Sequence, residues 1–129
     1  MDSMTRTLRV AIADESAAFV DAAATYVSTL PGFTVAGVAR TAPQAVELVE
    51  SSMPDVLILD LGIGARKGLE LVRQFKAAPS APRIVALSLF HTPQALAAAR
   101  RAGADELVGK ESFIAGLSQA FARLFPGDA

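Results

Sequence analysis

Residues 56–60 read Val-Leu-Ile-Leu-Asp, an apolar run that ends in a carboxylate. A short stretch that is apolar at every position is typical of a strand covered on both faces in a parallel sheet. Pro54-Asp55 leads into this run, and a glycine-containing loop follows it. We therefore expect residues 56–59 to form the central strand of a parallel sheet, with Asp60 at its carboxyl end.

Similar apolar runs alternate with segments of helical periodicity along the rest of the chain. They cover residues 8–13, 33–38, 84–87 and 106–109, and the run at 33–38 alternates large and small residues as an edge strand would. The segment after each run repeats its apolar residues every three or four positions, as on one face of a helix. Five strand–helix units predict an α/β domain, (βα)5, with a doubly wound parallel sheet between two layers of helices.

Helix boundaries are marked by residues with known positional preferences. Thr41 and Thr92 are expected to cap the helices that follow them, and Ser112 is expected to cap the last one. Pro31-Gly32 and Gly103 are expected to end the helices that precede them.

Length and composition fit one globular domain over residues 1–129, with a core from about 8 to 125. The absence of cysteine excludes a disulfide framework, a zinc finger and a cysteine nucleophile. A net charge of −1 argues against direct binding of nucleic acid or of anionic membranes. No apolar run approaches the roughly 18 residues of a membrane span, and residues 1–6 lack a signal-peptide core. We expect a cytoplasmic protein.

Polar side chains stand where the predicted strands end. Asp14 and Glu15 follow the first strand, Asp60 the third, Ser88 the fourth and Lys110 the fifth. Open parallel sheets bind ligands at these carboxyl ends, near the point where the strand order reverses. With the flavodoxin-like strand order 2-1-3-4-5, the first and third strands are neighbours. The three carboxylates are then expected to converge on one pocket, with Ser88 and Lys110 on its rim.

Three carboxylates in one cleft repel one another, and a single lysine cannot neutralise them. A hard divalent cation with oxygen ligands can, so the cluster points to Mg²⁺ held by Asp14, Glu15 and Asp60. Such a site suits phosphoryl chemistry, with Asp60 as the nucleophile that forms an aspartyl phosphate. Lys110 and the Ser88 hydroxyl would then hold phosphoryl oxygens.

Four motifs carry a resemblance to a known family. They are the acidic pair Asp14-Glu15, the segment 55–61 with Gly68 beyond it, Ala86-Leu87-Ser88, and Ala102-Gly103-Ala104-Asp105 leading to Lys110. From about Leu8 to Leu124 the chain resembles the receiver domain of two-component response regulators. The resemblance implies that the acidic pair binds Mg²⁺, that Asp60 is the phosphoacceptor, and that Ser88 and Lys110 contact the phosphoryl group.

The resemblance implies that the domain is a switch controlled by phosphorylation rather than a turnover enzyme. A histidine kinase or a phosphotransfer protein would donate the phosphoryl group to Asp60, and the domain would promote its own phosphorylation and hydrolysis. Ser88 and Lys110 would move toward the new charge and shift the helix after Thr92. The face over residues 89–111 is therefore expected to control a partner or an output domain. A homodimer across the last two helices and a DNA-binding output domain outside this chain are both compatible with the resemblance.

The sequence departs from the family pattern at four positions. Gly64 replaces a usual proline, so a more flexible loop is expected there. Leu89 replaces a small residue and should narrow access to the phosphoryl group. Leu107 replaces the aromatic switch residue. Glu111 replaces a cis-proline, and we expect a trans or strained bond there because a non-proline cis bond costs about 3–4 kcal/mol. A polar residue at this position is common in the subgroup with helix-turn-helix output domains.

Other functions remain as alternatives. The departures from the pattern suit a degenerate receiver that acts as a phosphorylation-independent binding scaffold. An aspartyl-phosphate phosphatase would usually carry a second aspartate where Gly62 stands, and a flavodoxin-like cofactor binder would need a phosphate-binding loop in place of residues 14–17. Arg66-Lys67 could steer an anionic donor or form a plain charged loop. His91, the sole histidine, is interpreted as a solvated loop residue.

Overall fold

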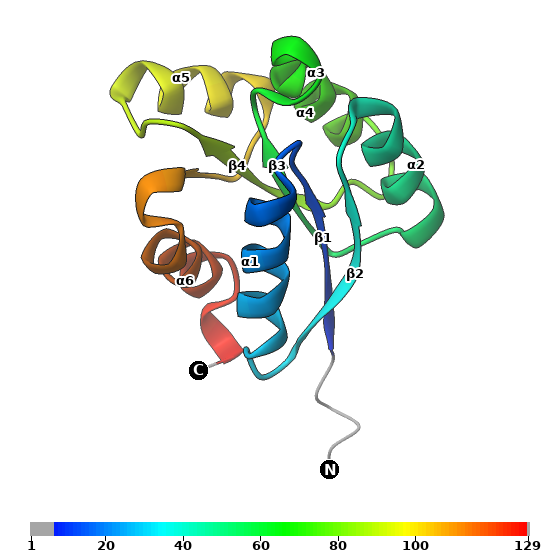
Figure 1. The fold of residues 1–129 in the computed structure, drawn as a ribbon, viewed down its shortest axis with the longest axis vertical. Coiled ribbons are helices and arrows are strands. Elements are labelled where there is room, and N and C mark those ends of the chain that lie inside the picture. Colours follow the sequence, from blue (N-terminus) through cyan, green and yellow to red (C-terminus); the bar gives the residue numbers. More distant parts are fainter. Residues whose placement is uncertain (1–6, 129) are drawn as a thin grey trace.

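The computed structural model describes residues 7–128 and contains a five-stranded parallel sheet in the order β2-β1-β3-β4-β5 (Figure 1). The strands are β1 (Leu8–Ala13), β2 (Phe33–Ala39), β3 (Val56–Asp60), β4 (Arg83–Ser88) and β5 (Glu106–Gly109). This is the predicted flavodoxin-like strand order, and the predicted strands agree with the observed ones to within one residue at each end. The expectation of an α/β fold is confirmed.

Helices cover both faces of the sheet, as the strand–helix alternation predicts. They are α1 (Ala17–Ser28), α2 (Ala42–Ser52), α3 (Ile63–Arg66), α4 (Gly68–Lys76), α5 (Pro93–Ala102) and α6 (Phe113–Leu124), with short 3-10 turns η2 (Lys110–Ser112) and η3 (Pro126–Asp128). Helices α1 and α6 pack on one face, and α2, α4 and α5 pack on the other. No helix within residues 7–128 is long and apolar enough to cross a membrane.

The central strand β3 is buried because its side chains alternate between two hydrophobic cores. Leu57 and Leu59 pack in the core under α2, α4 and α5, whereas Val56 and Ile58 pack in the core under α1 and α6. All four side chains are fully buried. The run that is apolar at every position thus supplies both cores and leaves Asp60 as the first polar group at the sheet edge.

The predicted helix ends lie at the expected positions, although one of the caps makes no side-chain hydrogen bond. Thr41 and Thr92 accept hydrogen bonds from the backbone three residues on, and Gly103 ends α5 with a φ of 114°. Pro31 and Gly32 follow the end of α1. Ser112 is the N-cap residue of α6, but its side chain makes no capping hydrogen bond, and residues 110–112 form a 3-10 turn that runs into the helix.

The loop expected after β3 is instead a short helical turn with unusual backbone angles. Gly64, Ala65 and Arg66 have φ values of 63°, 60° and 72°, all in the left-handed region. Such angles suit glycine but are costly for residues with a Cβ atom. The replacement of the family's proline by Gly64 fits this geometry, since proline cannot adopt a positive φ.

Candidate functional site

The ends of three strands bring Asp14, Asp60 and Lys110 together. Asp14 follows β1, Asp60 ends β3, and Lys110 begins the turn after β5. The Lys110 Nζ atom lies 2.6 Å from Asp14 Oδ2 and 3.3 Å from Asp60 Oδ1. Strands β1 and β3 are direct neighbours, so their carboxylates are adjacent, and the long lysine side chain reaches them across β4.

Asp14 is held firmly inside this group. Its side chain is almost fully buried, with 1% of the residue exposed. Oδ1 accepts a hydrogen bond from the backbone N–H of Ser16 at 2.9 Å. Oδ2 forms the ion pair with Lys110 and, among the described residues, accepts no hydrogen bond with regular geometry. A buried carboxylate oxygen of this kind is available to a further positive group.

Asp60 and Lys110 have altered proton affinities for related reasons. Burial, and then the charge of Asp14, raise the pKa of Asp60, while Lys110 opposes that rise. Burial by itself would lower the pKa of Lys110, but its close ion pair with Asp14 and the charge of Asp60 outweigh that effect and raise it. Lys110 therefore stays cationic. Its Nζ atom also lies 4.8 Å from the centroid of the Phe19 ring, within the range of a cation–π contact.

Glu15 does not join the two aspartates, in contrast to the expected convergence of three carboxylates. Its Oε2 atom accepts a hydrogen bond from the backbone N–H of Gly64 at 3.0 Å, and its carbonyl oxygen accepts one from Arg40 Nε at 2.9 Å. Within residues 7–128 no three His, Cys, Asp or Glu side chains are placed to hold a metal. The physical reason is local: the Lys110 ammonium bridges the two aspartates and offsets part of their charge, and the Gly64 N–H donates to Glu15.

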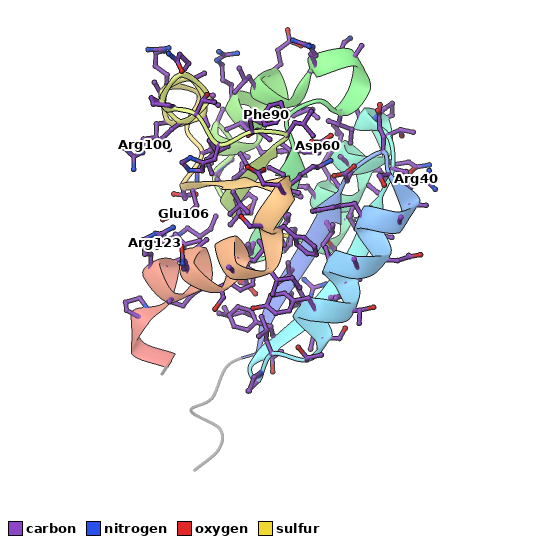
Figure 2. The ribbon with its side chains drawn as sticks, turned by 60° about the vertical axis from the view of Figure 1, so that its left-hand side comes forward. Arg40, Asp60, Phe90, Arg100, Glu106 and Arg123 are labelled. Atoms are coloured by element: carbon purple, nitrogen blue, oxygen red, sulfur yellow. The ribbon has the colours of Figure 1, made fainter. Side chains whose placement is uncertain are left out.

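Ser88 lies at the end of β4, next to β3, as predicted. Its hydroxyl donates a hydrogen bond to the carbonyl oxygen of Phe90. Leu89 and Phe90 are both exposed, at 66% and 65%, which is unusual for large apolar side chains. Figure 2 shows Phe90 and Asp60 at the same end of the sheet.

An open cleft of about 540 Å³ lies over Asp60. Its lining contains two cationic side chains, one carboxylate, one hydroxyl and several apolar groups: Asp60, Leu61, Gly62, Arg66, Leu69, Ser88, Leu89, Ala95, Ala98 and Lys110. A carboxylate that lines an open cleft with cations beside it is accessible to an anionic ligand.

The family model for the response regulator receiver domain matches residues 10–122, most of the chain and every residue of this site. The chain belongs to the response regulator receiver domain family. This assignment confirms the resemblance that the five strand-end residues carry. Asp14, Asp60, Ser88 and Lys110 all lie within the matched residues, and the last three of them line one cleft.

The chain is similar to two curated proteins of different names and to one solved response regulator. Protein-glutamate methylesterase/protein-glutamine glutaminase 5 of Myxococcus xanthus is 38% identical over 84% of this chain and 31% of that protein. The nitrate/nitrite response regulator protein NarL of Escherichia coli is 33% identical over 66% of this chain and 39% of that protein. A solved two-component response regulator of the LuxR family from Aurantimonas has a TM-score of 0.84 and 26% identity, and the match covers 94% of this chain and 86% of that one. The matched region is well under half of either curated relative.

Two contacts of the site were not predicted from the sequence. The spacing of Phe19 among the apolar residues of α1 predicts a core residue and gives no sign that its ring lies beside Lys110. The hydrogen bond between Glu15 and Gly64 joins residues 49 positions apart, and no local pattern indicates it. The Lys110–Glu111 bond is trans, one of the two expected outcomes, since the described residues contain no cis peptide bond.

Proposed function

We propose that this receiver domain accepts a phosphoryl group on Asp60 and acts as a phosphorylation-controlled switch. The observation that carries the proposal is the placement of Asp60 in an open cleft, 3.3 Å from an ammonium group that is itself anchored by the buried Asp14. A histidine kinase or a phosphotransfer protein would supply the phosphoryl group. The Asp60 oxygen would bond to phosphorus while the donor's nitrogen leaves with the electron pair of the broken bond.

Mg²⁺ fits the residues of this site. The carboxylates are hard oxygen donors, and Asp14 Oδ2 is buried without a regular hydrogen bond. Asp14 and Asp60 would hold the ion, and Glu15 would join them only after its hydrogen bond to the Gly64 N–H is broken. When bound, the ion would neutralise charge on the transferred group. Lys110, held by both aspartates, would keep the nucleophile in position and bind a phosphoryl oxygen.

The β4–α5 loop is proposed to transmit the change. The Ser88 hydroxyl donates to the carbonyl oxygen of Phe90 in its own loop, so a phosphoryl oxygen on Asp60 would compete for that donor. Breaking the Ser88–Phe90 contact would free the exposed segment before α5 to rearrange. The face over residues 89–111 would then present a different surface to a partner, a second copy or an output domain in the cytoplasm.

Asp60 is expected to be the site of phosphorylation in vitro. Wild-type protein incubated with acetyl phosphate and Mg²⁺ should gain the mass of one phosphoryl group, and Asp60→Asn should gain none, as intact mass spectrometry can show. Because burial and Asp14 both oppose ionisation of Asp60, the neutral asparagine should be tolerated by the fold. Asp55→Asn, a carboxylate at the start of the same strand and away from the cleft, is the matched control.

The same experiment separates the switch from the alternative of a phosphorylation-independent binding scaffold. The scaffold is favoured by the contact between Glu15 and Gly64, which keeps the third carboxylate away from the aspartate pair. If neither acetyl phosphate nor beryllofluoride with Mg²⁺ changes the mass or the amide NMR spectrum of the wild-type protein, the switch proposal is wrong. A mass gain that persists in Asp60→Asn would place the modification elsewhere.

Leu89→Ala is expected to raise the rates of phosphorylation and of hydrolysis. Leu89 lines the cleft over Asp60, and its truncation should open the path for donor and water, by about three- to tenfold for a barrier change of about 1 kcal/mol. Stability should change little, because the side chain is 66% exposed. Time courses of phosphoprotein formation and decay measure both rates.

Phe90→Ala is the matched control for the Leu89 prediction. Phe90 is as exposed as Leu89 but does not line the cleft, and its contact with Ser88 is made by a backbone oxygen that the substitution keeps. Two results would contradict a specific effect of Leu89 on access to Asp60. One is that Leu89→Ala reacts at the wild-type rates, and the other is that Phe90→Ala is accelerated as much as Leu89→Ala.

A further inference from the structure

The left-handed turn beside Asp60 is the most strained backbone segment among the described residues. Ala65 and Arg66 adopt φ values of 60° and 72°, although each carries a Cβ atom. Backbone of this kind persists only where surrounding contacts impose it, and it often occurs at functional sites. The turn lies four to six residues after Asp60, so it can fix the position of a side chain beside the cleft.

Contacts from outside and inside the turn hold it in place. The N–H of Gly64 donates to Glu15 Oε2 at 3.0 Å, which ties the turn to the segment after β1. The N–H of Arg66 donates to the carbonyl oxygen of Gly62 at 3.1 Å. The direction in which the Arg66 side chain leaves the backbone is therefore set by the fold, even though the residue is exposed.

Arg66 and Lys67 leave this turn on different sides. Arg66 lines the cleft over Asp60 together with Ser88 and Lys110. The Cβ atom of Lys67 lies instead beside Gly64, on the side where Ala42 of α2 packs. The structure thus separates two basic residues that the sequence presents as one pair.

The two cations of the cleft differ in what they already bind. Lys110 is shared between Asp14 and Asp60. Within the described part of the chain, the Arg66 guanidinium makes no hydrogen bond or ion pair. A carboxylate that attacks a phosphoryl group brings like charges together, so a cation without a carboxylate partner is the group that can offset the repulsion. The planar fork of arginine also matches phosphoryl oxygens in geometry.

We propose that Arg66 binds the oxygens of the phosphoryl group as it is transferred to Asp60, an inference that rests on the proposed phosphoacceptor function. With acetyl phosphate, the bond between Asp60 Oδ and phosphorus forms as the bond between phosphorus and the acetyl oxygen breaks, and acetate leaves with the electron pair. Arg66 donates N–H groups to the phosphoryl oxygens throughout and gives up no proton.

Arg66→Ala tests this role against Lys67→Ala, which removes the same charge one residue away. Loss of a hydrogen bond to a charged group should lower the second-order rate constant for acetyl phosphate about tenfold in Arg66→Ala. The same rate constant in Lys67→Ala should stay within about twofold of the wild-type value, as expected when a solvated surface charge is removed. Arg66→Lys should recover part of the loss. The affinity for beryllofluoride with Mg²⁺, followed by amide NMR, should fall in parallel.

Arg66→Gly tests whether a loss of phosphorylation rate in Arg66→Ala comes from a change in the backbone of the turn rather than from the missing guanidinium. Glycine accepts the positive φ at this position, so this variant should unfold at an equal or higher urea concentration than the wild type. It should nevertheless lose phosphorylation rate and beryllofluoride affinity as Arg66→Ala does. A structural role would predict normal behaviour in Arg66→Gly.

The outcomes separate the inference from the proposed function. If the wild type is phosphorylated and Arg66→Ala behaves like Lys67→Ala, the role of Arg66 is overturned while the phosphoacceptor function stands. If the wild type takes up neither phosphoryl group nor beryllofluoride, the proposed function fails and the inference falls with it. A loss in Arg66→Ala that high salt abolishes, or that Lys67→Ala shares, would indicate general attraction of anions and would also overturn the inference.

Discussion

Lys110→Ala is expected to lower the free energy of unfolding by about 3–5 kcal/mol, the range seen when one partner of a buried ion pair is removed. Lys110 Nζ is the ion-pair partner of Asp14 Oδ2, at 2.6 Å, and Asp14 is 1% exposed. Without the ammonium, two carboxylates would face each other with no described positive group between them. Urea unfolding followed by circular dichroism measures the change, provided that Mg²⁺ is removed by a chelator.

Two further variants test whether the uncompensated charge is the cause. Asp14→Asn in the Lys110→Ala background should recover most of the lost stability, because asparagine removes the buried charge at nearly constant volume. Lys76→Ala breaks another lysine–aspartate pair, at 3.0 Å, but both side chains there are about one-quarter exposed, and the cost should be about 1 kcal/mol. Equal losses in Lys110→Ala and Lys76→Ala, or no recovery in the double variant, would contradict the explanation.

The sheet and the central part of the site could be predicted because they follow from short-range patterns. The run at residues 56–59 reveals a strand covered on both faces, since only such a strand can be apolar at every position. Parallel strands of the predicted order must end at one edge, and this alone brings Asp14, Asp60 and Lys110 together.

The position of Glu15 and the conformation of the turn after Asp60 could not be predicted in the same way. Glu15 had two possible partners, a cation beside the aspartates or a backbone amide, and the choice depends on where Gly64 lies after folding. The left-handed angles of Ala65 and Arg66 oppose local preference and are imposed by contacts that close only in the folded chain. Local backbone propensities, which depend on neighbouring residues in the sequence, do not reflect such long-range contacts.

Gly68→Ala is expected to be strongly destabilising, although the residue opens a helix. Helix propensity by itself would favour alanine over glycine by about 1 kcal/mol. A Cβ atom on Gly68, however, would lie 2.3 Å from Leu61 Cα and 2.5 Å from the Leu61 carbonyl oxygen. These are backbone atoms that cannot rotate away, so the segment after β3 must move. We expect a net loss of about 3 kcal/mol or more, because overpacking of this severity exceeds the usual cost of an added methyl group.

The same displacement connects the fold to the proposed chemistry, because residues 61–68 follow directly on Asp60 and contain the turn that positions Arg66. Gly68→Ala should therefore also slow phosphorylation by acetyl phosphate, even at temperatures where the variant stays folded. Gly62→Ala is the matched control for stability alone: its φ of −84° suits alanine, and its Cβ would meet Asp60 Oδ2 at an ordinary 3.5 Å. Urea unfolding of both variants measures the effect on stability, and intact mass spectrometry of Gly68→Ala against the wild type measures the effect on phosphorylation. A Gly68→Ala protein as stable as Gly62→Ala would mean that the close approach of Gly68 to Leu61 does not determine the shape of this loop.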